Sequence, residues 1–519
     1  MKSAPVLKTY TKKERNLYLT GLAGQNIIYN IIGGTLSYYL QFTILIPAMA
    51  VSYIMAFARV WDAVNDPVMG TLVDRTRTKW GKCRPFLIFS PIPIYIFTVA
   101  CFTNFGFFDP HAQHLYAGKN LLIVAWALLS YLIWEMAYTA GDIPLWGITA
   151  LMTEDQKQRA KLLSLARIFG GIGGGIAILS IQSVALALGK AFAPMMGGAP
   201  QGERMGFIMA AVIYGGVATA AYQMVGIFTK EKIAASPEKH TMKENFALMW
   251  TNKPFRQVLL SGILGSPKQL IALAAMPLVS YYYANKDPKL TIQYIALLGG
   301  CLMIGQFLAM GFTPRLLTRL SKKDAYNYSN LLSAAPYAVV FFLYKFFPDN
   351  LTEPLFLGIS ALLFFVNGAF QGVASVIQSL MIADAVDYEE YKNGIRPDGV
   401  FFAGQTFIAK ITTGIATIIS GIAYKTVGFS DKVVEEVNKF IADGHVARTE
   451  PKYASYMMIL FFLVSIPPMI GCLVSVIPTW RYSLSDEEHT RILDELNRRR
   501  HEKDEQTIRE PAAVAENNE

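Results

Sequence analysis

The stretch FARVWDAVNDPVMGTLVDRTRTKWGKCRPF, residues 57–86, combines an apolar first half with two carboxylates one helical turn apart. Asp62, Asn65 and Asp66 follow at positions i, i+3 and i+4, so they share one face of a helix. The apolar residues around them are typical of a segment that crosses a membrane, where an ionisable side chain is costly and usually functional. The second half is a basic loop, which predicts that this helix ends at the membrane surface.

The composition of the whole chain agrees with a membrane location. Its 519 residues are 53% hydrophobic and 16% charged, whereas a soluble domain carries about 25% charged residues. Apolar stretches of about 20 residues recur along the chain, and each can cross a hydrocarbon core about 30 Å thick. The first residues, MKSAPVLKTYTKKERN, are polar and basic, so no cleaved signal peptide is expected. We therefore expect an all-α integral membrane protein.

Twelve transmembrane helices are predicted, with both termini in the cytoplasm. Lys and Arg gather in the N-terminal segment and in loops that follow even-numbered spans, which places these segments on the cytoplasmic side of the plasma membrane. The same loops account for the net charge of +9 without a nucleic-acid partner. The predicted spans are 17–44, 47–73, 86–105, 120–151, 164–188, 206–228, 257–284, 291–313, 325–346, 353–384, 400–425 and 455–480.

The predicted spans form two six-helix halves. A polar linker, residues 229–256, separates an N-terminal half, residues 1–228, from a C-terminal half, residues 257–480. This plan is that of the major facilitator fold, in which substrates bind near the membrane midplane between the halves.

Two polar segments lie outside the spans. Residues 426–454 are predicted to be an external loop. Residues 481–519 are expected to form a cytoplasmic tail. Within it, Ser485 and Glu488 have the spacing of a capping box, which predicts a short helix to about residue 501, and the remaining residues are expected to be disordered.

The polar face of span 47–73 predicts a cation site. Oxygen ligands on one helix face, two of them anionic, suit a hard monovalent cation or a shared proton. Asp62 and Asp66 would be the metal ligands if the cation is Na⁺. The alternative is a structural ion pair with Arg59 or with a cationic residue of another helix. No histidine falls within a predicted span, so proton coupling would have to use carboxylates.

Span 120–151 contains WEMAYTAGDIPLWG, in which Tyr138, Asp142 and Trp146 follow at i, i+4 and i+8. Thr139 lies beside Tyr138, and Glu135 precedes Thr139 by one turn. An aromatic ring can stack on the C–H face of a sugar while a carboxylate accepts hydrogen bonds from its hydroxyls. The stripe therefore predicts sugar binding, although Tyr and Trp also serve as packing residues and interface anchors.

Two cations within predicted spans complement these acids. Arg167 is either a site residue or a side chain that snorkels to the membrane surface, and Lys410 is either a site residue or part of a structural ion pair. The segment GGIGGGIAI (170–178) indicates close helix packing rather than a nucleotide loop. The four cysteines lack metal-site spacing, and no nucleophile–base constellation is present, so we expect no disulfide, no organic cofactor and no enzyme activity.

Three motifs resemble the glycoside–pentoside–hexuronide:cation symporter family: WDAVNDPVMGTLVDRTRTKWGKCRPF, YTAGDIPLWG and IADAVDYEEYKNGIRPDGVFFAGQTFIAK. The resemblance extends to about residue 485. It implies Na⁺ or H⁺ symport of a glycoside, pentoside or hexuronide by alternating access, with cytoplasmic gate segments at 74–85 and 387–398. The implied cation site is Asp62, Asn65, Asp66 and Thr139. The implied substrate site is Asn26, Tyr138, Asp142, Trp146, Arg167, Gln405, Thr406 and Lys410.

The sequence departs from the family pattern at three positions. Asn26 stands where the pattern has a sugar-binding carboxylate, Glu135 replaces a small residue, and Cys83 replaces a phenylalanine. Loss of one acid favours an anionic sugar such as a hexuronide, whereas Glu135 acts in the opposite direction. A carrier of a lipid-like amphiphile and a sensor that binds solute without transport are the alternatives. The expected partners are a sugar, a monovalent cation and membrane lipid, and analogy with the fold predicts a monomer.

Overall fold

The computed structural model describes residues 8–109, 112, 116–233, 242–394, 396–426 and 431–500. Every regular element in these ranges is a helix, so the expected all-α class is confirmed. The chain forms two compact units. Unit 1 comprises Met1–Met249, Val386–Thr406 and Thr490–Glu519, and unit 2 comprises Trp250–Ala385 and Phe407–His489. The expected residue bounds of the two six-helix halves stay a prediction.

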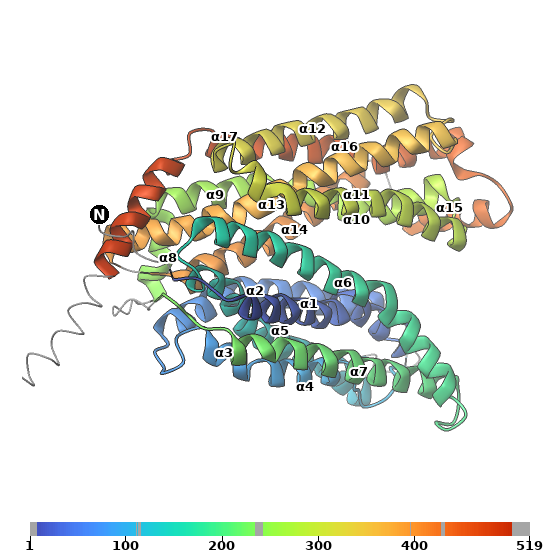
Figure 1. Cartoon of the computed structure of the whole chain (residues 1–519). Helices are drawn as coiled ribbons and strands as arrows, with labels where there is room; N and C mark the ends of the chain where they lie inside the picture. The colour runs from blue at the N-terminus through green and yellow to red at the C-terminus, as the bar shows by residue number, and fades with distance from the viewer. Residues whose placement is uncertain are drawn as a thin grey trace, which may run out of the picture. The chain divides into compact units, whose positions relative to one another are not determined.

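Unit 1 is built from long helices that run side by side (Figure 1). Helices α1, α6 and α7 pack against one another, and α2 packs against α5. A Cβ atom added to Gly173 of α6 would overlap the backbone of Ala23 of α1, so these two helices are in close contact as the Gly-rich segment predicts. The elements are α1 (Lys12–Tyr38) with a π-helical end (Tyr39–Thr43), α2 (Ala48–Arg75), α3 (Arg84–Phe89), α4 (Pro91–Cys101), α5 (Gly118–Leu151), α6 (Gln156–Phe192), α7 (Ala199–Phe228) and α8 (Met242–Thr251).

Side-chain caps determine where two of these helices begin. At the start of α1, the Thr11 N–H donates to Glu14 Oε2 at 2.7 Å, and the Glu14 N–H donates to Thr11 Oγ1 at 3.2 Å. At the start of α6, Asp155 Oδ1 accepts from the Lys157 N–H at 2.8 Å. Each cap satisfies a backbone donor that has no partner inside the helix.

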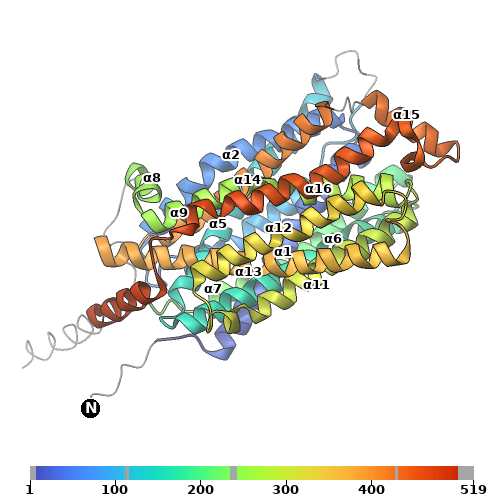
Figure 2. The same cartoon turned by 90° about the horizontal axis from the view of Figure 1, so that it is seen from above.

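Unit 2 is also helical, and α12 and α16 lie side by side in it (Figure 2). Helices α13 and α14 contribute residues to both units. The elements are α9 (Lys253–Leu264), a 3₁₀ turn (Ser266–Gln269), α10 (Leu270–Leu278) with a π-helical end (Val279–Tyr283), α11 (Pro288–Leu316), α12 (Lys322–Phe346), α13 (Pro354–Asn393), α14 (Asp398–Thr426), α15 (Asp431–Ala442), 3₁₀ turns (Ala447–Thr449 and Pro451–Tyr453), α16 (Ala454–Ser475) and α17 (Ile477–Trp480).

Each of the twelve predicted spans coincides with a helix or a run of helical segments in the described part of the chain. By length and hydropathy alone, 7 described helices can cross a membrane, or 8 if the bent pair Lys253–Leu264 and Ser266–Tyr283 is one span. Helix α2 is outside this set, and the polar face formed by Asp62, Asn65 and Asp66 lowers its hydropathy.

Two segments predicted to lie outside the spans contain short helices. The linker 229–256 contains α8, and the predicted loop 426–454 contains α15. The α15 sequence, DKVVEEVNKFIA, places Val437 in the apolar core of unit 2, with Val433 and Phe440 packed against that core. Its many charges hid an amphipathic pattern.

The tail begins as predicted. Residues 486–500 are helical, and Ser485 Oγ accepts from the Glu488 N–H at 3.1 Å. The predicted disorder at the chain's end concerns residues 501–519, which lie outside the described residues.

Candidate functional site

The predicted cation residues lie where α2 meets α5. Asp62 and Asp66 are fully buried, and Asn65 is 7% exposed. Thr139 of α5 donates its hydroxyl proton to Asp66 Oδ1 at 3.1 Å. Glu135, one turn earlier on α5, is also buried. The structure thus brings Thr139 to Asp66, on a helix face rich in the oxygen ligands that a small cation prefers.

The predicted substrate residues centre on Asp142 of α5. Gln25 Nε2 of α1 donates to Asp142 Oδ1 at 2.8 Å and also bonds to the Tyr138 hydroxyl. Asn26 Nδ2 donates to Gln25 Oε1 at 2.9 Å and to the carbonyl of its own helix at Leu22. Asn26 therefore supports the glutamine, and Gln25 is the residue of α1 that contacts the carboxylate. The sequence predicted Asn26 because the family pattern marks that position. The pattern does not show which of the two neighbouring side-chain amides, Gln25 or Asn26, faces α5.

The aromatic residues of this site are held in different ways. Tyr138 stacks on Trp134 with ring centroids 5.0 Å apart. The ring centroid of Tyr29 from α1 lies 5.3 Å from that of Tyr138. Trp146 lies under the guanidinium of Arg167 from α6, whose Cζ is 4.5 Å from the ring centroid. A cation over an indole face is a favourable pairing. Tyr138 is thus braced by other rings, whereas Trp146 and Arg167 form a cation–π pair.

The first turns of α14 complete this part of unit 1. Thr406 Oγ1 lies 3.4 Å from Asp142 Oδ2, and the neighbouring Gln405 is partly buried. Lys410 follows Thr406 by four residues, so both lie on the same face of α14. Because Lys410 belongs to unit 2, its role as a substrate-site residue stays a prediction.

A second polar cluster joins the predicted gate segments within unit 1. Asp74, at the end of α2, accepts from the backbone N–H groups of Gly399 at 2.9 Å and Val400 at 2.8 Å, so it caps α14. Lys82 Nζ lies 2.9 Å from Asp74 Oδ1 and 2.6 Å from Asp398 Oδ2. These are short, charge-assisted contacts, which are the stronger class of hydrogen bonds.

Arginines extend this cluster. Arg159 Nη1 lies 2.6 Å from Asp387 Oδ2, and Arg396 Nη1 lies 2.9 Å from Asp387 Oδ1. Arg396 also pairs with Glu390 and approaches Asp398 Oδ2 at 3.3 Å. The structure therefore brings segment 387–398 against α6 and the loop after α2 through buried ion pairs.

Charge neighbours keep the buried cations of this cluster ionised. Burial by itself would lower the pKa of Lys82, but Asp398 and Asp74 outweigh it and the pKa is raised. Burial would likewise lower the pKa of Arg396, which Asp398 and Glu390 raise above its ordinary value. Both cations stay protonated at all physiological pH values.

Sequence reasoning missed Glu231, which follows α7. Its carboxylate accepts from the backbone N–H groups of Lys82, Cys83 and Arg84, at 3.0, 2.9 and 3.1 Å. These three donors line the entry to α3, so Glu231 holds the loop that carries Lys82. No local signal identifies such a contact, because Glu231 and Lys82 are 149 residues apart.

The tail helix also reaches the cluster. Arg500 Nη2 lies 2.7 Å from Glu390 Oε2, and Arg500 Nη1 lies 3.8 Å from Glu154 Oε1. Arg499 donates to the carbonyl of Tyr391 at 3.4 Å. The run of arginines at 498–500 was visible in the sequence, but its partners were not.

The buried carboxylates, the polar–aromatic stripe and the long apolar helices define a class: a multi-pass membrane transporter. A family profile described as MFS/sugar transport protein matches residues 17–486. The chain belongs to that family. This membership confirms the family and the fold that the motifs led us to expect. It also confirms a multi-pass location in the plasma membrane.

Known relatives are similar over most of the chain. The inner membrane symporter YicJ of Escherichia coli (strain K12) is 25% identical over 492 residues, which cover 93% of this chain and 94% of that protein. The isoprimeverose transporter of Lactiplantibacillus pentosus is 25% identical over 406 residues, 78% of each chain. Among solved structures, FucP in the outward conformation has a TM-score of 0.59 at 12% identity, covering 90% of this chain and 98% of that chain. That likeness concerns the fold.

Proposed function

We propose that this protein is a cation:sugar symporter that carries a glycoside, pentoside or hexuronide with Na⁺ or H⁺ by alternating access. Membership in the sugar-transport family supports this proposal, as do relatives named as an isoprimeverose transporter and a putative glycoside/cation symporter. We further propose that it acts as a monomer in the plasma membrane with both termini in the cytoplasm.

One observation carries the proposal: α5 contacts both predicted sites. Thr139 bonds to Asp66, and Asp142, three residues later, bonds to Gln25. Three residues of an α-helix span about 4.5 Å. A cation at Asp66 and a sugar at Asp142 would therefore act on the same turn of one rigid helix.

The coupling then follows from electrostatics. A bound cation relieves the repulsion between Asp62 and Asp66 and fixes Thr139, which orders the turn that carries Asp142. The sugar then binds more tightly, and by linkage it strengthens cation binding by the same factor. The membrane potential adds about 2.3 kcal/mol per charge per 100 mV toward inward movement of the cation.

The polar cluster of the gate segments acts later in the cycle. Its buried ion pairs join the loop after α2, α6 and segment 387–398. Release on the cytoplasmic side requires these contacts to separate, and each broken charge pair needs a new partner or water. The cluster is thus proposed to hold this end closed until both solutes are bound.

The hydrogen-bonding side chains of the proposed substrate site favour a sugar over a lipid-like amphiphile. Gln25, Asp142 and Thr406 offer hydrogen bonds, and Trp146 offers an apolar face. Such a pairing matches a polyhydroxylated ring, whereas an acyl chain would leave the polar groups unsatisfied. Arg167 beside Trp146 is compatible with the carboxylate of a hexuronide.

The test uses de-energised cells that express this protein. A panel of glycosides, pentosides and hexuronates is added while electrodes follow external pH and Na⁺. We expect one sugar class to trigger uptake of one cation, and the Asp66→Asn variant to lose it. Asp349→Asn, which neutralises an exposed acid, is the matched control. If no sugar moves either cation, the proposal fails, and radiolabelled uptake then separates an uncoupled carrier from a sensor.

A further inference from the structure

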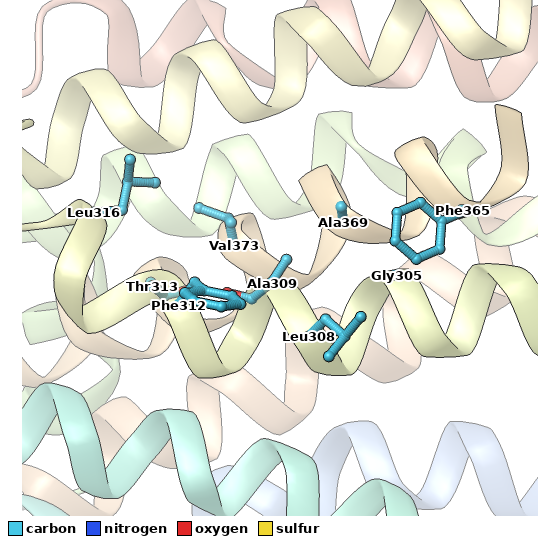
Figure 3. Close-up of a pocket in the computed structure, with 9 residues that line it drawn as sticks. All are labelled: Gly305, Leu308, Ala309, Phe312, Thr313, Leu316, Phe365, Ala369 and Val373. Atoms are coloured by element: carbon cyan, nitrogen blue, oxygen red, sulfur yellow. The ribbon is translucent and has the colours of Figure 1, made fainter. Parts of the chain in front are cut away.

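Unit 2 carries an apolar groove of about 370 Å³ between α11 and α13 (Figure 3). Its volume is within the range of about 300–1,000 Å³ that is typical of small-molecule sites. Leu308, Phe312 and Leu316 of α11 form one wall, and Phe365, Ala369 and Val373 of α13 form the other.

Close approach of the two backbones creates this groove. A Cβ atom added to Gly305 would overlap the carbonyl oxygen of Phe365, and one added to Gly368 would overlap that of Leu302. With the backbones in contact, the larger side chains project to either side and leave a furrow between them. Thr313 is the polar residue of the lining, and its hydroxyl donates to the Ala309 carbonyl at 2.8 Å. The furrow therefore presents an apolar surface.

The exposed wall and the length of the groove match one leaflet of a membrane. Leu308 is 53% exposed and Phe312 is 59% exposed, so this wall is open to an apolar partner such as an acyl chain. From Gly305 to Leu316 the groove extends over eleven helical steps, or roughly 16 Å of helix. That is about half of a hydrocarbon core of roughly 30 Å, so the groove accommodates one acyl chain.

Two cations lie at one end of the groove. The Arg315 guanidinium carbon is 5.8 Å from the Phe312 ring centroid, and Arg319 is exposed one turn later. The next cations are already paired, since Lys322 contacts Asp384 and Lys323 lies 3.6 Å from Asp324. Among the described residues, neither Arg315 nor Arg319 forms an ion pair with a carboxylate.

We propose that this groove is a binding site for an anionic phospholipid. One acyl chain lies between α11 and α13, and the phosphate pairs with Arg315 and Arg319. Guanidinium groups recognise phosphate oxygens in a fork geometry, and basic sites between helices at the membrane surface select anionic headgroups. The occupant is a membrane lipid rather than free phosphate, because the apolar groove contributes most of the contact. None of its residues belongs to the proposed sugar or cation site.

The test is a lipid titration of the purified full-length protein, with bound lipids counted by native mass spectrometry. Phosphatidylglycerol and phosphatidylcholine with identical acyl chains are the probes. We expect phosphatidylglycerol to bind roughly 30-fold more tightly, because two guanidinium groups attract its anionic headgroup. The double variant Arg315→Gln/Arg319→Gln should lose this preference. Lys345→Gln, an exposed cation at the end of α12, should keep it.

A second variant tests the groove itself. Ala309→Leu fills the furrow and leaves both arginines in place, so binding of both lipids should fall on the order of tenfold. Arg319→Gln alone replaces the double variant if the latter does not fold. Equal affinity of the two lipids for the unmodified protein overturns the proposal, as does a preference that survives in the arginine variant.

Discussion

Asp74→Asn should open the loop that carries Lys82. The Asp74 carboxylate accepts three hydrogen bonds, from Lys82 Nζ and from the N–H groups of Gly399 and Val400. The asparagine side chain keeps one acceptor oxygen. Its NH₂ group replaces the other oxygen, so a donor then faces one of the backbone N–H donors. Breaking a buried ion pair costs about 3–5 kcal/mol, and the remaining Lys82–Asp398 contact at 2.6 Å places the cost at the lower end.

A cost of about 3 kcal/mol increases the population of the open loop roughly 100-fold, because 1.4 kcal/mol corresponds to a factor of ten. Cys83 reports this opening. Its side chain is fully buried, and burial together with the Glu231 carboxylate raises the pKa of its thiol well above the ordinary value. In the closed loop the thiol is therefore protonated and inaccessible, and it should react slowly with an alkylating reagent.

The assay is the rate of Cys83 alkylation by N-ethylmaleimide in inside-out membrane vesicles. The background carries alanine in place of the other cysteines, Cys101, Cys301 and Cys472. We expect alkylation to be about 100-fold faster in Asp74→Asn and unchanged in Asp349→Asn. If Asp74→Asn melts at the temperature of the unmodified protein and alkylates at the same rate, Asp74 does not hold the loop, and the assignment of this cluster as a gate is refuted.

Three further predictions follow from single contacts. Glu231→Gln leaves one acceptor for three N–H donors, which costs about 1–3 kcal/mol. Alkylation of Cys83 should therefore be at least several-fold faster, and an unchanged rate would contradict the role of Glu231. Gln25→Leu removes the donor to Asp142 at 2.8 Å and should weaken equilibrium sugar binding roughly 10- to 100-fold, because a bond to a charged group contributes about 1.5–3 kcal/mol. Asn26→Leu should have a smaller effect, and the reverse order would show that Asn26 is the direct ligand. Glu14 has a lowered pKa, since burial raises it but the Thr11 N–H and Lys232 outweigh burial. The stabilisation by ionised Glu14 is complete above its pKa in the unfolded chain, about 4.3, and is lost as pH falls through its lowered pKa in the folded protein. The melting temperature of Glu14→Gln should therefore lack the part of the decrease at acid pH that protonation of Glu14 causes.

Helix placement and the carboxylate face of α2 could be predicted because both depend on local spacing. Asp62, Asn65 and Asp66 must share a face wherever the helix packs, and the structure buries all three. The apolar stretches of about 20 residues are long enough to cross a membrane as helices, which bond every backbone polar group within the segment.

Contacts between distant segments could not be predicted in this way. The rotation of α1 about its axis decides that Gln25 rather than Asn26 faces Asp142, and that rotation depends on packing against α6 and α7. The partners of Glu231 and Arg500 lie more than 100 residues away. Helix α15 was missed for a different reason, because its charged residues mask four apolar positions that pack inward.

The first turns of α14 connect the two polar parts of unit 1. Asp398 and the N–H groups of Gly399 and Val400 bind Lys82 and Asp74 of the proposed gate. Thr406, about 12 Å further along the same helix, lies 3.4 Å from Asp142. A sugar that takes up the Asp142 carboxylate has to replace or rearrange the Thr406 contact. Because α14 is continuous between these points, such a shift would act on the helix start that Asp74 caps. The proposed sugar site and the proposed gate thus share one rigid element, which would give a physical route from substrate binding to release of the gate.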